Sequence, residues 1–224
     1  MQGQAQQQAY DRGITIFSPD GRLYQVEYAR EAVKRGTASI GVRTEGGVVL
    51  AVDKRIRSEL MERTSVEKIH KADDHIGIAS AGHVADARQL IDFARRRAQV
   101  NRLRYGEPIG VETLTKDVTD HIQQYTQVGG ARPFGVALII GGIEDGEPRQ
   151  ENYAESMDLD GGIELELRAL ATVNDDELSP EGVGVATVDV ETEQFLELSN
   201  DETEEYLAEL GLLAEDGDTE PEEE

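Results

Sequence analysis

Apolar positions recur along the chain with two periods, which predict helices and strands in a definite order. Helical spacing predicts a first helix over 21–34, and Gly36 is expected to end it. Strict alternation interrupted by turn residues predicts two β-hairpins, over 37–56 and 66–82. The first third of the chain is therefore expected to hold one helix followed by four strands.

Two long helices and a buried strand are predicted next. Apolar stripes run through 84–106 and 110–127, as in helices that cover a core with one face. The stretch 134–142 is short and continuously apolar, which is typical of a strand buried on both faces. The middle of the chain is therefore expected to cover and extend a sheet.

After residue 144 the periodic signals weaken. They still predict a helix over 162–173, a hairpin around Thr192 and a last helix over 201–213, which Ser199 or Asn200 would cap. Hairpins that bracket pairs of helices indicate antiparallel sheets with helices on their outer faces. The expected fold is α+β, a four-layer α/β/β/α sandwich.

The two ends of the chain depart from this pattern. Residues 1–12 are rich in glutamine and lack an apolar period, so they are expected to be mobile. The tail 214–224 is acidic and cannot bury apolar surface, so it is expected to be disordered. Residues 13–213 are expected to form the folded domain.

Charge is distributed unevenly along the chain, whose net charge is −24. Residues 1–143 carry 20 basic and 17 acidic side chains, whereas residues 144–224 carry 2 basic and 29 acidic ones. This excess of carboxylates argues against nucleic acid as a partner. Only 5 of the 22 basic residues are lysine, and high acidity with little lysine is typical of a protein kept in solution by concentrated salt.

The composition also limits the kinds of metal or cofactor site that the chain could form. The chain has no cysteine, which excludes disulfides and thiolate metal sites. Its four histidines lack metal-ligand spacing with carboxylates, so no metal site or cofactor is expected. No apolar run is long enough to cross a membrane, and the start does not resemble a signal peptide, so a cytoplasmic location is expected.

One set of residues suggests catalysis. Thr37 begins the first predicted strand, Asp53 ends the second and Lys68 begins the third, so the three are expected to converge at one end of a sheet. A threonine, a carboxylate and a lysine form a plausible nucleophile set, if cleavage after Gly36 frees the threonine amine as a base. The alternative is that Thr37 is a structural strand residue, since a well-formed helix precedes it.

Long segments of the chain resemble one known family. The stretch AYDRGITIFSPDGRLYQVEYAREAVKRGTASIG resembles the N-terminal signature of α-type subunits of the archaeal 20S proteasome, and VEKIHKADDHIGIASAGHVADARQLIDFAR continues the match. The composition resembles that of the salt-adapted archaeal branch. The resemblance implies a sandwich of the N-terminal nucleophile hydrolase type.

The resemblance also implies a role without catalysis. In this family seven α subunits form a ring that caps rings of β subunits, and peptide hydrolysis takes place on the β subunits. An α-type subunit retains its leading segment, so Thr37 is expected to be structural. The N-terminal segment would gate the axial pore. The residues implied to hold that gate open are Tyr10, Asp11, Arg12, Pro19 and Tyr28.

The same resemblance implies a docking pocket between neighbouring α subunits. There Lys68 would pair with the C-terminal carboxylate of a tail from a regulatory ATPase ring, which suits a cation in a partly desolvated groove. The residues implied to lie near it are Glu27, Arg30, Gly36 and Gly82. The implied partners are other α subunits, β subunits, the ATPase ring and unfolded protein substrates in transit.

The chain departs from the family after Arg149. The family continues with two further strands and a helix, whereas here the chain soon reaches DLDGGIELELRAL. Losing a buried aliphatic side chain costs about 2–5 kcal/mol, out of a net stability of about 5–15 kcal/mol. An internal deletion near 150–158 is therefore expected to endanger the monomer and its assembly, unless neighbouring subunits or salt compensate.

Three functions follow from these observations. The first is a non-catalytic, gating subunit of the α ring. The second is a threonine peptidase that frees Thr37 by its own cleavage. The third is a shortened remnant that does not assemble by itself and instead binds full-length α subunits.

Overall fold

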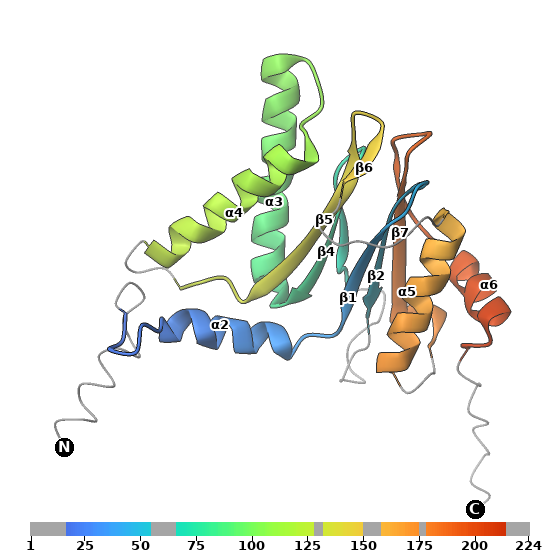
Figure 1. Ribbon diagram of the computed structural model, residues 1–224, viewed down its shortest axis with the longest axis horizontal. Helices are drawn as coiled ribbons and strands as arrows, with labels where there is room; N and C mark the ends of the chain where they lie inside the picture. The colour runs from blue at the N-terminus through green and yellow to red at the C-terminus, as the bar shows by residue number, and fades with distance from the viewer. Residues whose placement is uncertain (1–16, 55–65, 128–131, 150–157, 175–177, 214–224) are drawn as a thin grey trace, which may run out of the picture.

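Two antiparallel sheets stack face to face in the computed structural model of the protein (Figure 1). The structure describes residues 17–54, 66–127, 132–149, 158–174 and 178–213. The predicted mobile start and disordered tail lie outside these ranges and stay predictions.

Each sheet has four strands. The first has the order β1-β2-β7-β8 and the second the order β3-β4-β5-β6. All neighbouring strands within each sheet are antiparallel. The bounds are β1 Ser39–Arg43, β2 Gly47–Asp53, β3 Ile69–Asp73, β4 Ile76–Gly82, β5 Val136–Glu144, β6 Glu147–Arg149, β7 Val183–Asp189 and β8 Phe195–Glu197.

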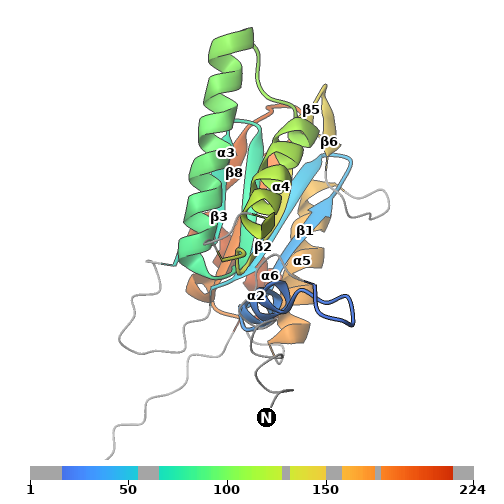
Figure 2. The same ribbon diagram turned by 90° about the vertical axis from the view of Figure 1, so that its left-hand side faces the viewer.

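Helices cover both outer faces, as Figures 1 and 2 show. Helices α3 (Val84–Tyr105) and α4 (Val111–Gln127) pack on the second sheet, and α5 (Leu159–Val173) with α6 (Asn200–Leu210) on the first. The α2 helix (Tyr24–Lys34) contacts β4 and β5. This arrangement confirms the predicted four-layer α/β/β/α sandwich.

The core lies in three apolar layers. One lies between the sheets and includes Leu50 and Ala79, which are fully buried. The second lies under α3 and α4, and the third lies under α5 and α6, where Leu167 and Leu207 are fully buried. The alternation in the strands and the stripes on the helices account for all three, because each element turns an apolar face inward.

Most predicted elements occur within a few residues of their expected bounds. The first helix begins three residues later than expected, at Tyr24. Ser199 caps α6 in a reciprocal capping box with Glu202, as its position predicted. The short strand β6 was not predicted, because Glu147–Arg149 has no apolar alternation and is held by its pairing with β5.

The second sheet has an incomplete edge. Strand β6 pairs only with residues 142–144 of β5, so residues 136–141 have no strand on that side within the described part of the chain. The burial of the β5 side chains changes at the point where its pairing with β6 ends. Residues 141–143 are buried, whereas residues 136–140 are half-buried or exposed. An apolar strand is thus left partly uncovered beside α4.

Candidate functional site

The ends of three strands bring Thr37, Asp53 and Lys68 together, as the sequence predicted. Thr37 lies two residues before β1, Asp53 is the last residue of β2, and Lys68 directly precedes β3. The backbone N–H of Asp53 donates to Ala38 O at 3.0 Å, which aligns the start of one strand with the end of the other. The hydroxyl of Thr37 donates to Asp53 O at 2.5 Å.

The ammonium group of Lys68 points into the subunit. Its Nζ donates to Thr37 Oγ1 at 2.7 Å, to Asp53 O at 2.9 Å and to Thr37 O at 3.1 Å, and Ala38 O lies at 3.2 Å. Lys68 is 7% exposed. The lysine therefore holds two strand ends together from within the subunit.

Burial controls the protonation of this lysine. Desolvation lowers the pKa of Lys68 to about 8, and the charge of Asp53 opposes that shift only in part. A lysine of lowered pKa beside a threonine hydroxyl is one half of an activated nucleophile. The other half would be a free amine on Thr37, which exists only if the chain is cleaved after Gly36.

Gly36 and Gly82 form a close backbone contact next to this cluster. A Cβ built on Gly36 would lie 2.6 Å from the backbone nitrogen of Gly82. Gly82 has φ +114°, and a Cβ there would lie 2.5 Å from Gly135 O. Only glycine fits both positions, which brings the end of α2 against the end of β4.

The other two predicted docking residues lie further along α2. Glu27 accepts a two-pronged hydrogen bond from Arg22, at 2.7 Å from Nε and 2.5 Å from Nη2, and this pairing lowers the pKa of Glu27. Arg30 is exposed and lines an apolar groove between α2 and the start of β5. Within one subunit, Gly36, Gly82 and Lys68 lie together, whereas these two lie about 10 Å or more away along the helix.

Two of the predicted gate residues fall in the described part of the chain. Pro19 lies in the turn at 18–21, where Gly21 N donates to Ser18 O at 2.9 Å. Tyr28 is 52% exposed on α2, and its ring centroid lies 6.5 Å from that of Tyr24. Tyr10, Asp11 and Arg12 lie outside the described residues.

Sequence reasoning missed a buried carboxylate that positions the start of β5. Asp86 accepts two hydrogen bonds from Arg132, at 2.5 and 2.6 Å, and one from Gly135 N at 2.8 Å. Burial opposes ionisation of Asp86, but these donors outweigh it and lower its pKa. The pairing spans 46 positions, and no local pattern in the sequence signals it.

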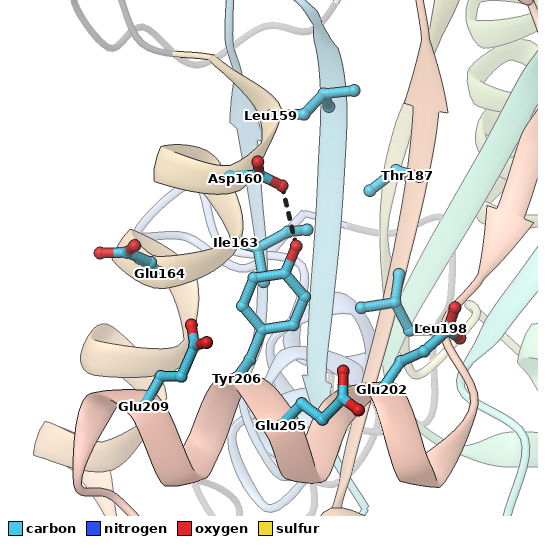
Figure 3. A pocket seen from close by; sticks show the side chains of 10 residues that line it. All are labelled: Leu159, Asp160, Ile163, Glu164, Thr187, Leu198, Glu202, Glu205, Tyr206 and Glu209. Atoms are coloured by element: carbon cyan, nitrogen blue, oxygen red, sulfur yellow. Dashed lines mark hydrogen bonds between the residues drawn. The ribbon is translucent and has the colours of Figure 1, made fainter.

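An acidic cleft of about 580 Å³ lies between α5 and α6 (Figure 3). Its floor includes Ile163 and Leu198, and the hydroxyl of Tyr206 donates to Asp160 at 2.8 Å across it. Burial, with the contact to Asp160, raises the pKa of Tyr206 to about 12. The described residues contain no cluster of His, Asp and Glu that could hold a metal ion.

No helix in the described part of the chain is both long and apolar enough to span a bilayer.

Comparison with known proteins places the chain in a family. The proteasome subunit family matches residues 33–149, and the N-terminal signature of the A type of proteasome subunits matches residues 10–32. The alpha 1 proteasome subunit of Haloarcula marismortui is 72% identical, over all of this chain and 98% of the relative. The alpha proteasome subunit of Natronomonas pharaonis is 69% identical over the full length of both. The alpha 1 proteasome subunit of Haloferax volcanii is also 69% identical over both full lengths.

The relatives also carry residues that this chain lacks. The alignment with the Haloarcula marismortui protein spans 255 positions, whereas this chain has 224 residues. The family match ends at residue 149. The absence of two strands after Arg149 stays a prediction. The family itself is established: the chain is a member of the proteasome subunit family, of the α type found in halophilic archaea.

Proposed function

We propose that the chain is a non-catalytic subunit of the outer ring of the 20S proteasome core, and that it acts in the cytoplasm. The observation that carries this proposal is the packing of α2. Helix α2 contacts β4 and β5, and Gly82 and Gly135 approach Val33 and Ala32 so closely that a side chain on either glycine would press against them. The segment before Thr37 is therefore part of the fold, unlike a disposable leader.

The N-terminal sequence of the purified chain distinguishes a structural subunit from a self-processed threonine peptidase. A structural subunit keeps the residues before Gly36, so sequencing begins at Met1 or Gln2. A self-processed threonine peptidase would begin at Thr37. The Lys68–Thr37 contact supports the peptidase, which also needs cleavage after Gly36 to free the amine of Thr37.

The proposed gate consists of residues 1–12, held open through Pro19 and Tyr28. Pro19 stiffens the turn that leads into α2, and the exposed ring of Tyr28 offers a surface for a neighbouring segment. Deleting residues 2–12 is expected to raise peptide hydrolysis by particles assembled with β subunits. An unchanged rate would remove the gating role and leave the ring role standing.

The proposed docking pocket comprises Lys68, Gly36 and Gly82, with Glu27 and Arg30, and its ligand is the C-terminal carboxylate of a regulatory ATPase tail. Lys68 already contacts four protein oxygens, so a docking carboxylate must share its positive charge with them. Replacing Lys68 with Ala is expected to abolish stimulation by the ATPase while basal peptide cleavage remains. Lys68→Arg, which keeps the charge, separates docking from simple loss of folding.

A second candidate function is favoured by the incomplete edge of β5. A shortened chain with an uncovered apolar strand could bind full-length α subunits and alter their ring. This second function requires at least that the chain co-purifies with a full-length α subunit when the two are expressed together. Recovery of each chain separately would exclude it.

A further inference from the structure

A groove of about 680 Å³ runs between α4 and the uncovered edge of β5. Its apolar wall is made by Val118 and Ile122 of α4 and by Leu138 and Ile140 of β5. Leu138 and Ile140 pack against the core under α3 and α4, yet both are only half-buried. Residues 136–140 of β5 are therefore left half-buried or exposed at the groove, whereas residues 141–143 of the same strand are buried.

The backbone of β5 adds hydrogen-bonding capacity to this groove. On one side residues 136–141 pair with β4, from Val136 opposite Gly82 to Gly141 opposite Gly77. On the other side β6 ends at Arg149, opposite Gly142. Every second residue of 136–141 thus turns its N–H and C=O toward the groove, which is the arrangement that accepts an added strand.

The number of residues after β6 limits how far the chain itself could run along the groove. Nine Cα–Cα steps separate Arg149 from Asp158, the N-cap of α5. Both ends lie at the same end of the sandwich, because Leu159 lies against Gly46 in the β1–β2 turn and Gly141 lies against Val48. Following β5 from residue 142 to 136 and returning requires about 40 Å, whereas nine extended steps span at most about 32 Å, so they cannot follow the whole edge and return.

The charge of the groove is opposite to that of the chain. Arg43, Lys116 and Arg149 line it, and the carboxylate that accompanies them is Glu112, which pairs with Lys116 at 2.5 Å. The whole chain carries −24. An added strand would turn alternate side chains toward α4 and the others toward the β1 side, where Arg43 lies. Apolar residues suit the first side and carboxylates the second.

We propose that this groove binds an extended, acidic polypeptide segment with aliphatic side chains at alternate positions, which joins the second sheet as a strand antiparallel to β5. The proposal does not depend on ring assembly, gating or ATPase docking. A second copy of this chain fits less well, because two-fold pairing of the β5 edges would bring the cationic linings of both grooves together.

Binding of a designed peptide tests this directly. The probe is a fluorescein-labelled octapeptide of alternating valine and glutamate, and its reference alternates valine and lysine. Fluorescence anisotropy with the full chain, at the lowest KCl concentration that keeps it folded, is expected to show saturable binding of the glutamate peptide, at least tenfold tighter than the lysine peptide. Equal binding, or no saturation of either peptide, would overturn the proposal.

Matched variants locate the binding. Ala137→Glu places a carboxylate on the exposed edge of β5, where it repels an acidic strand, and is expected to weaken binding at least tenfold, whereas Ala208→Glu on exposed α6 leaves it unchanged. Arg149→Glu is expected to weaken binding at least threefold, and Arg168→Glu, the same change at the only other basic residue after position 144, leaves it unchanged. Circular dichroism verifies that each variant is folded.

Two outcomes would contradict the assignment. One is equal loss of binding in a groove variant and its control. The other is a dimer of the chain that Ala137→Glu dissociates and that the glutamate peptide does not displace, which would make a second copy the occupant. Sedimentation velocity with and without the peptide distinguishes this dimer from a peptide complex.

Discussion

The Nζ of Lys68 lies 2.7 Å from Oγ1 of Thr37, and the same ammonium group reaches Asp53 O at 2.9 Å. This one side chain therefore joins the start of β1 to the end of β2 from the start of β3. With these contacts to Thr37, Ala38 and Asp53, the lysine ties the strand ends of the sandwich together.

Removing this lysine is expected to destabilise the protein. Lys68→Met removes the donor that Thr37 O, Ala38 O and Asp53 O share. Ala38 O keeps the Asp53 N–H and Asp53 O keeps the Thr37 hydroxyl, so the expected loss is about 1–3 kcal/mol. Lys71→Met is the control, since Lys71 forms only an exposed pair with Asp74. Urea unfolding in concentrated KCl measures both, and equal effects would contradict the structural role.

A buried carboxylate is expected to weaken the fold. Glu166 on α5 is fully buried, and neither of its side-chain oxygens forms a hydrogen bond of normal geometry. Burial raises the pKa of Glu166 to about 8, which the nearby backbone of Val42 only partly offsets. Glu166→Met is expected to raise the free energy of unfolding by about 1–3 kcal/mol. The exposed Glu164→Met should leave it nearly unchanged, and a loss of stability in the Glu166 variant would show that this carboxylate has a partner.

These two groups predict a minimum of stability near pH 8. The ordinary pKa of Glu166 is 4.5, so between about pH 4.5 and 8 the folded chain holds a proton that the unfolded chain has lost, and stability falls as pH rises. The ordinary pKa of Lys68 is 10.5, so between about pH 8 and 10.5 the unfolded chain holds the extra proton, and stability rises with pH.

Urea midpoints measured from pH 5 to 10 test this minimum. Glu166→Gln is expected to flatten the acid side of the curve, and Lys68→Met the alkaline side. A wild-type midpoint that rises steadily from pH 5 to 8 would contradict the account of Glu166.

Gly82 is expected to be intolerant of a methyl group, because an added Cβ would meet the backbone of Gly135. Gly82→Ala adds both backbone strain at φ +114° and a clash with Gly135 O, so the expected loss exceeds about 2 kcal/mol. Gly106→Ala separates the two causes, because Gly106 has φ +79° with no atom within 4 Å of a Cβ, and about 1 kcal/mol is expected there. Thermal melts compare the variants, and equal shifts would mean that the close contact adds nothing.

The sequence predicts those features of the fold that depend on local periodicity and on turn residues. The order of the elements, the four-layer arrangement and the convergence of Thr37, Asp53 and Lys68 follow from alternation and from the positions of strand ends. Contacts between residues that are far apart in the sequence leave no local sequence pattern. The Asp86–Arg132 pair, the buried position of Glu166 and the direction of the Lys68 ammonium depend on how the layers pack, and only the structure supplies them.

The native mass of the purified chain in 2 M KCl tests the central claim most directly. As a subunit of a seven-membered α ring, the chain is predicted to form a discrete species of about seven times the 24.6 kDa chain mass. Light scattering after size-exclusion chromatography measures that mass. A monomer or a polydisperse aggregate would contradict the ring role, and the gating and docking proposals would fall with it.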